Sequence, residues 1–368
     1  MALSKETLYQ IALTHIKGMN LLLAKTLLAK TGHASDIFRE KGESLQNLCG
    51  LKTQIFNSET IQKAFDTANK EIDFIEKNHI TPIFFTDPEY PARLAECIDA
   101  PALLYYRGTA NLNSPKILSI VGTRHATNYG RGFCQTLLQE LSLWFPDLLI
   151  VSGLAYGIDI CAHREALNNN LQTIGILAHG MNTLYPSTHR KTAAEMLSHG
   201  GLLTEYSSQH PVHKGNFVAR NRIVAGISDA TLIVESAEKG GSLITADIAE
   251  SYHRDVFALP GNIQNEYSKG CNQLIRKNKA ALITSAQDIA DAMCWTIVEK
   301  KPKQASLFPE LNDTEALLMN ILEEKGECQI NQLTIASNLP TSQVLANLLE
   351  LEFKGMIRPY PGGIYRKL

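Results

Sequence analysis

Three short segments combine glycine with small polar or cationic residues, and each directly follows an apolar run. They are Gly122-Thr123-Arg124, Ser152-Gly153, and Gly240-Gly241-Ser242 with Thr245. Glycine lets the backbone approach a ligand closely, and the free amides at the start of a following helix bind anions. Arginine adds a planar cation whose geometry matches that of phosphate. We therefore predict that the three segments build one phosphate-binding site.

A fourth segment, residues 210–228, brings cations and an aromatic ring to the start of an apolar helix. Its candidate binding residues are Lys214, Phe217, Arg220, Asn221 and Arg222. This combination is typical of sites for single-stranded nucleic acid, because Lys and Arg neutralise the backbone while bases stack on the ring. The alternative interpretation places Phe217 in the core and the charges on a solvated helix start.

Residues 152–165 invite a catalytic interpretation because they contain Ser152, Asp159 and His163. However, no G-x-S-x-G motif surrounds Ser152, and the H-x-E at His163 is not followed by the P-C-x-x-C of a zinc deaminase. Asp159 and His163 are four residues apart on an expected helix, which favours a structural Asp–His pair. We predict no catalytic residue, no metal site and no cofactor.

The elements that must position these segments form an α/β pattern. Short apolar runs alternate with helix-length segments, and the expected strands are 117–121, 148–152, 173–177, 201–206, 231–236, 256–260 and 281–284. Strands that are apolar throughout imply a parallel sheet covered by helices on both faces. In such Rossmann-like sheets ligands bind at the carboxyl ends of the strands, which is where the three glycine-containing segments lie.

The predicted fold class is therefore α/β: a Rossmann-like parallel sheet domain with a small N-terminal helical domain and a C-terminal winged-helix domain. The expected boundaries are 1–78 for the helical (helix-hairpin-helix or SAM-like) domain, 79–298 for the Rossmann-like domain, 299–311 for a linker and 312–368 for the winged-helix-like domain. The charged, proline-bearing composition of residues 299–311 indicates the linker. In the last domain three helices precede a hairpin around Pro361, and Thr341 is the expected N-cap of the third helix.

The N-terminal helices are separated by the sequence "IKGMN", residues 16–20. A helix-hairpin-helix DNA binder has a similar turn, whose backbone amides contact phosphate, but Asn20 stands where its second glycine would be. Plain helix packing is the alternative role for this turn.

Composition restricts the function classes further. The net charge is −2 over 368 residues, so a basic surface covering the whole chain is not expected, and any nucleic-acid binding must be local. The seven cysteines are scattered and never spaced C-x-x-C, which argues against a disulfide framework or structural zinc and favours a reducing cytoplasm. Neither a secretory signal nor an apolar stretch long enough to cross a membrane is present, so we expect a cytoplasmic protein without membrane contact.

Taken together and in this order, the motifs resemble the DNA-processing protein A family, also called DprA or Smf. The matching segments span residues 80–285 and include "SIVGTRHATNYGR", "SGLAYGIDICAH", "TLYP", "GGLLTEY", "RNRIVAGIS", "TLIVESAEKGGSLITADIAE" and "DVFALPGNI". The resemblance implies a non-enzymatic, cytoplasmic protein that binds single-stranded DNA during natural transformation and loads a RecA-type recombinase onto it. It also implies a homodimer. Carried over by position, Arg124, Lys214, Phe217 and Asn221 match the family's basic DNA pocket.

The sequence departs from the family pattern in three places, one of which is Arg254 after His253, where a glycine is common in the family. Val218-Ala219 stands where the family has a proline and often a basic residue, and Gly180-Met181-Asn182 replaces G-L-D. These departures put the backbone path beside Phe217 in question and remove one carboxylate.

Two alternative functions remain from the residues. "EKGGSLITADIAE" resembles the P-G-G-x-G-T-x-x-E motif of the Lonely-guy phosphoribohydrolases, which bind and cleave a nucleotide, but Lys239 replaces the proline and the Gly241–Thr245 spacing is one residue longer. A winged-helix transcription regulator is the second alternative. Its recognition-type helix, residues 341–355, would carry one lysine and two glutamates, which suits protein contact better than a DNA groove.

Overall fold

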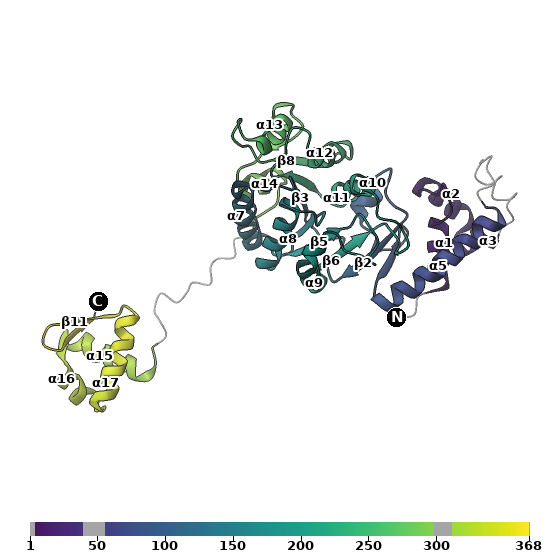
Figure 1. The fold of residues 1–368 in the computed structure, drawn as a ribbon. Coiled ribbons are helices and arrows are strands. Elements are labelled where there is room, and N and C mark those ends of the chain that lie inside the picture. The colour runs from purple at the N-terminus through teal and green to yellow at the C-terminus, as the bar shows by residue number, and fades with distance from the viewer. Residues whose placement is uncertain (1–3, 40–55, 298–310, 368) are drawn as a thin grey trace. The chain divides into compact units, whose positions relative to one another are not determined.

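The computed structural model describes residues 4–39, 56–297 and 311–367. The chain forms two compact units, residues 1–298 and 299–368. Figure 1 shows the helices and strands of both units. Of the predicted linker 299–311, all but the last residue lies outside the described residues.

The first unit is built on a nine-stranded sheet with the order β1-β2-β6-β5-β4-β3-β7-β8-β9. Its strands are β1 (Thr81–Phe84), β2 (Leu103–Gly108), β3 (Ile117–Val121), β4 (Leu149–Ser152), β5 (Gln172–Ile176), β6 (Gly200–Thr204), β7 (Ala230–Ile233), β8 (Asp255–Ala258) and β9 (Ala281–Leu282). Strands β3 to β9 pair in parallel, which confirms the predicted sheet, and β2 and β1 extend it as an antiparallel edge that we did not predict.

Helices cover both faces of the sheet because the strands are apolar on both sides. Along β3, Ile117 and Val121 belong to one core, and Leu118 and Ile120 belong to the other, as the two-residue period of a strand requires. The first core is completed by α11 (Asn221–Gly226), α12 (Gly241–Ser251) and α13 (Lys269–Arg276). The second is completed by α7 (Asn128–Trp144), α8 (Ile158–Asn168) and α14 (Ala286–Ala292). A smaller cluster packs α9 (Arg190–Ser198) against the same sheet.

Chain direction across the sheet reverses between β3 and β7. From β3 the chain adds β4, β5 and β6 on one side, and it then returns to add β7, β8 and β9 on the other. The loops that leave neighbouring strands at such a point diverge and open a crevice at the carboxyl edge, where ligands bind in folds of this type.

The described residues of the N-terminal part form the helices α1 (Lys5–Thr14), α2 (Leu21–Thr31), α3 (Ala34–Arg39) and α5 (Ser58–Asn78). The predicted helical hairpin is confirmed. Its turn has Gly18 at φ 87°, and the Oδ1 atom of Asn20 caps α2 by accepting from Leu23 N at 2.9 Å. The helices share their apolar core with β1 and β2 through Phe84, Leu103 and Tyr105.

The second unit is a winged helix, as predicted. It contains α15 (Asp313–Lys325), β10 (Glu327–Gln329), α16 (Ile330–Ser337), α17 (Thr341–Phe353), β11 (Ile357–Tyr360) and β12 (Ile364–Lys367), with the sheet order β10-β12-β11. The predicted N-cap at Thr341 is wrong. Thr341 is already the first helical residue, and Pro340 is the N-cap residue. Pro340 has φ −59° and makes no side-chain hydrogen bond to the helix.

Candidate nucleic-acid interface

A pocket of about 250 Å³ lies at the carboxyl ends of β3, β4 and β7, where the strand order reverses. We call it the strand-end pocket. The helices that follow β6, α10 (Lys214–Ala219) and α11, provide its remaining wall. The predicted site residues that line it are Gly122, Thr123, Arg124, Gly153, Phe217, Arg220, Asn221, Gly240, Gly241, Ser242 and Thr245.

The loop after β3 is held in shape by Glu235, which lies two residues after the end of β7. The backbone oxygen of Glu235 accepts from Thr123 N at 2.6 Å, and its carboxylate accepts from Thr127 N at 2.9 Å and Thr127 Oγ1 at 2.6 Å. Gly130 packs so closely on this carboxylate that a Cβ there would lie 2.4 Å from Oε2. The glycine pattern of this loop therefore serves its packing around Glu235, while Arg124 is left exposed.

Sequence reasoning missed Glu235. It is only 3% exposed, and its one signal was a carboxylate near the end of the mostly apolar expected strand 231–236.

Arg220 forms part of the pocket floor and joins two strand ends. Its side chain is buried, and Nη1 donates to the carbonyl oxygen of Gly153 at 2.6 Å and to that of Ile176. Asp159 is buried beside it and accepts from Gly153 N at 3.1 Å. Burial lowers the pKa of Arg220 and raises the pKa of Asp159, and the opposite charge of each partner counters the shift. Arg220 therefore has a structural task in addition to lining the pocket.

The expected Asp159–His163 pair is not what these side chains form. The carboxylate of Asp159 faces the amides of Gly153 and Ala155, whereas His163 Nδ1 lies 2.7 Å from Thr173 Oγ1 on β5. Both residues are buried in the protein interior. Asp159 binds the loop after β4, whereas His163 binds a side chain of β5.

The N-terminus of α12 closes another side of the pocket. Gly240 is its N-cap residue, and Gly240, Gly241 and Ser242 all line the pocket. A Cβ at Gly240 would lie 2.2 Å from Ser236 Oγ, so glycine is required there by close packing. The first turn of a helix carries unpaired amides and a partial positive charge, which gives this wall the character of an anion site.

Phe217 lies on α10 between the pocket and a second aromatic ring. It is half-buried, it lines the pocket, and its ring meets that of Tyr185 edge-on at 5.6 Å between centroids. Lys214 begins the same helix and is exposed, but it does not line the pocket. Val218, one of the departures from the family pattern, is exposed and lines the pocket beside Phe217.

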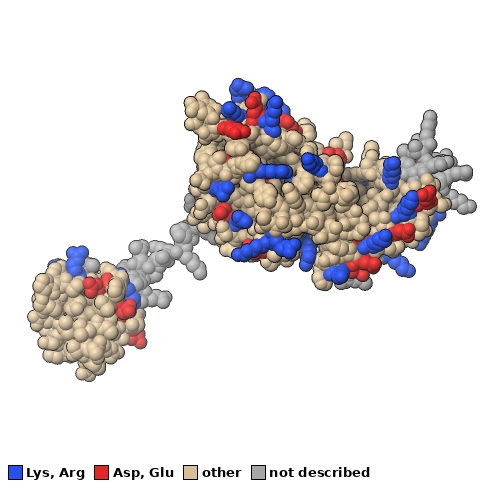
Figure 2. Space-filling model, viewed as in Figure 1, with Lys and Arg blue, Asp and Glu red and all other residues tan. Residues whose placement is uncertain are grey.

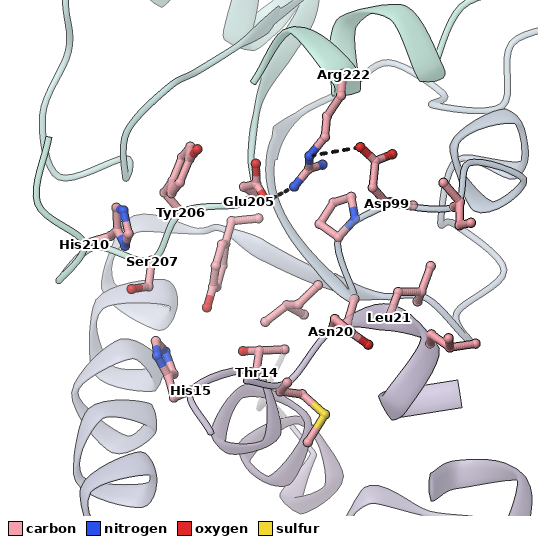
Figure 3. A pocket seen from close by; sticks show the side chains of 18 residues that line it. Thr14, His15, Asn20, Leu21, Asp99, Glu205, Tyr206, Ser207, His210 and Arg222 are labelled. Carbon is pink, nitrogen blue, oxygen red and sulfur yellow. Dashed lines mark hydrogen bonds and ion pairs between the residues drawn. The ribbon is translucent and has the colours of Figure 1, made fainter. Parts of the chain in front are cut away.

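Besides Lys214, two more predicted site residues do not line the strand-end pocket. Ser152 is fully buried, and its hydroxyl donates to the carbonyl oxygen of Ile120 at 2.6 Å. Arg222 points into a different cavity, where Nη2 lies 2.5 Å from a carboxylate oxygen of Glu205 and Nε lies 4.0 Å from one of Asp99 (Figure 3). The structure therefore does not bring these two side chains to the strand-end pocket.

That second cavity has a volume of about 630 Å³ and is lined by residues of the N-terminal helices and of the sheet domain. Its walls carry His15, Asn20, Tyr206 and His210 (Figure 3). The hairpin turn thus faces the protein's own sheet domain through Asn20, which favours the packing role over phosphate contact for this residue.

The surface charges are mixed in sign, as the near-neutral composition suggests. On the face shown in Figure 2, Lys and Arg are scattered over the surface and interspersed with Asp and Glu.

Within the described residues, no three His, Cys, Asp or Glu side chains are grouped so that they could hold a metal ion. The helices in the described ranges include none that is long and apolar enough to cross a membrane.

Comparison with known proteins decides the family. The sequence family described as DNA recombination-mediator protein A matches residues 81–294, and the DprA winged helix domain matches residues 301–363. The chain belongs to the DprA family. Its DprA-family relatives include protein Smf of Escherichia coli, which is 34% identical over 299 residues, covering 78% of this chain and 77% of that protein.

Solved DprA structures agree with the fold. The X-ray structure of DNA processing protein A from Streptococcus pneumoniae superimposes with a TM-score of 0.66 at 29% identity, covering 79% of this chain and 98% of that one. DNA processing protein A from Helicobacter pylori gives a TM-score of 0.53 at 31% identity, covering 58% of this chain and 95% of that one. The latter structure is described as showing that protein's single-stranded DNA binding mode.

Proposed function

We propose that this DprA-family protein binds single-stranded DNA in the strand-end pocket. The observation that carries the proposal is that Arg124, Phe217 and the N-terminus of α12, which are far apart in sequence, line one pocket at the reversal point of the sheet. Phosphate groups would contact the first-turn amides of α12 and the guanidinium of Arg124, and a base would stack against Phe217. The single-stranded DNA binding described for the Helicobacter pylori relative supports this assignment.

Pocket size supports a preference for single strands. A volume of about 250 Å³ lies just below the range of about 300–1,000 Å³ that encloses small ligands. Such a pocket accepts a phosphate or a single splayed base, whereas the stacked pairs of a duplex would remain outside it. Binding should weaken as salt rises, because each neutralised phosphate releases counterions.

A wider cellular role follows from the proposed binding of single-stranded DNA. We propose that the protein is a homodimer that loads a RecA-type recombinase onto single-stranded DNA in the cytoplasm during natural transformation. The family description as a recombination mediator supports that role. The six cysteines of the described residues are free thiols, which is compatible with a reducing compartment. Two pockets in a dimer would raise the affinity for one long strand without any new type of contact.

The domain boundaries also remain part of the proposal. Residues 1–78, 79–298 and 312–368 are proposed as the helical, DNA-binding and winged-helix domains. In the helical domain, the core shared with β1 and β2 indicates a firm attachment to the sheet.

The alternative functions have less geometric support. Glu250, the counterpart of the hydrolase glutamate, lies in the last turn of α12 and pairs with Lys279 Nζ at 2.9 Å rather than lining the strand-end pocket. On α17 the exposed residues Leu345, Leu349 and Phe353 recur every fourth position, which places an apolar stripe where a DNA-reading helix needs polar groups.

A binding titration tests the proposal. A labelled oligothymidine and a duplex of equal length would be titrated with wild type, Arg124→Ala and Arg358→Ala. Arg358 is an exposed arginine of the winged helix, so this variant removes the same charge from the other unit of the chain. We expect tighter binding of the single strand and a loss of affinity in Arg124→Ala alone. Equal binding of wild type and Arg124→Ala contradicts the site, and a selective loss in Arg358→Ala assigns DNA binding to the winged helix.

A further inference from the structure

The loop that follows β5 is fixed from inside by His179. This histidine is 1% exposed, and its Nδ1 lies 2.9 Å from the carbonyl oxygen of Gly180. Since a carbonyl only accepts, Nδ1 must carry the proton, and Nε2 is left to accept the backbone N–H of Tyr185 at 3.1 Å. Both ring nitrogens are therefore used to set the backbone position of Tyr185.

The side chain held in this way is an exposed aromatic ring. Tyr185 is 50% exposed, and its ring meets Phe217 edge-on, at 5.6 Å between centroids and 75° between planes. Phe217 in turn lines the strand-end pocket. An edge-to-face pair is a favourable arrangement that fixes both rings, and it leaves a face of the tyrosine open to a further planar group.

Tyr185 lies in the loop after β5, the strand next to those whose loops line the strand-end pocket. Loops after β7, β3 and β4 line the pocket, and β5 is the next strand in the sheet order. Adjacent strands are about 4.8 Å apart, so a ligand that runs along the carboxyl edge from β7 towards β5 reaches Phe217 and then Tyr185.

We propose that Tyr185 forms a second base-stacking subsite, which receives the nucleotide next to the one at Phe217, and that His179 is its positioning residue. The proposal rests on the proposed function and extends it. The ligand class is any nucleobase of a single strand, because stacking uses the ring face that all bases share and is tolerant of sequence.

Position-resolved fluorescence tests the subsite. The probe is a set of oligothymidines of increasing length, each with one 2-aminopurine, whose emission falls when it stacks. With wild type we expect quenching at two neighbouring positions. Tyr185→Leu should lose one of the two and bind the longer oligomers about tenfold more weakly, while quenching at the position next to Phe217 remains. Tyr185→Phe, the matched control that retains the ring, should behave like wild type.

The outcomes distinguish a failure of the Tyr185 subsite from a failure of the proposed single-stranded DNA binding. Wild-type behaviour of Tyr185→Leu at every length, together with weakened binding by Arg124→Ala, overturns the subsite and leaves the proposed function intact. If wild type binds none of the oligomers, the proposed function and the subsite are both overturned.

The positioning role of His179 has its own readout. His179→Ala should lose the same quenching position as Tyr185→Leu and keep the Arg124-dependent binding. Retention of that quenching signal overturns the positioning role. Because His179 is buried, a thermal melt accompanies the measurement, and if the variant does not fold, Tyr185→Leu decides the subsite, since replacing an exposed side chain removes no core residue.

Discussion

The guanidinium of Arg220 lies directly on the backbone of Gly153, with Nη1 2.6 Å from the carbonyl oxygen of Gly153. A Cβ at residue 153 would lie 2.2 Å from Nη1 and 2.4 Å from Cζ. The glycine after β4 is therefore needed to admit the side chain that links β4 to β5, and Gly153 and Arg220 form one structural unit beneath the strand-end pocket.

Replacing Gly153 by alanine should destabilise the protein. The guanidinium cannot move aside easily, because Nη1 donates to both Gly153 and Ile176. Overpacking of this kind typically costs about 1–3 kcal/mol, measured as the free energy of unfolding in urea. The matched control is Gly132→Ala in the second turn of α7, where a Cβ meets nothing within 4 Å. That change should stabilise the protein by about 0.5–1 kcal/mol, and the same loss in both variants would contradict the packing argument.

Arg220 and Arg124 should respond differently to substitution. Arg220→Lys loses the guanidinium nitrogen that donates to the carbonyl groups of Gly153 and Ile176 and alters the cation beside the buried Asp159, so we expect a loss of about 2 kcal/mol in unfolding free energy. Arg124 is exposed, so Arg124→Ala should change that free energy by no more than about 0.5 kcal/mol while weakening DNA binding. Urea unfolding and anisotropy on the same samples would separate the two roles. Equal stability of both variants would show that Arg220 has no structural task.

His163 should make the protein sensitive to mild acid. Burial, followed by the neighbouring charges of His189 and Arg220, lowers the pKa of His163 from 6.5 to about 3. Below pH 6.5 the unfolded chain takes up a proton at this residue and the folded chain does not, so stability is lost as pH falls from 6.5 towards 3. At pH 5 the loss attributable to His163 is about 2 kcal/mol.

The variant His163→Gln tests this dependence. It removes the titrating group, so the difference in unfolding free energy between wild type and variant should shift by about 2 kcal/mol in favour of the variant between pH 7 and pH 5. Parallel pH profiles for the two proteins would mean that His163 does not titrate abnormally. Comparing the variant with wild type isolates this residue from Asp159, whose pKa is raised by burial and whose contribution has the opposite sign.

The strands of the sheet were predictable because an uninterrupted apolar run signals a strand buried on both faces. All seven strands from β3 onward fall within or beside the expected ranges. The antiparallel pair β1 and β2 was missed because "TPIF" and "LLYYRG" are short and do not belong to the alternating strand–helix pattern of the parallel strands. In addition, β2 joins the sheet through β6, which is distant in sequence.

The loops of the site were predictable, but the directions of individual side chains were not. Arg220 and Arg222 are two residues apart on a nearly continuous helical path, which separates them by about 200° around the axis. One therefore faces the strand-end pocket and the other faces the cavity beside Glu205. Ser152 is the last residue of β4 and turns inward. Glu235 was missed because its partner Thr127 is more than a hundred residues away.

The salt dependence of binding should distinguish the residues that reach the DNA from those that do not. For single strands the logarithm of the binding constant falls with the logarithm of salt concentration by about 0.7 per neutralised phosphate. Arg124→Ala should therefore reduce the slope by about 0.7. Arg222→Ala should leave the slope unchanged, because this guanidinium is paired with Glu205 in the other cavity. Anisotropy titrations at four or more salt concentrations would measure both slopes. A reduced slope in Arg222→Ala with a normal slope in Arg124→Ala would move the DNA from the strand-end pocket to the cavity beside the N-terminal helices.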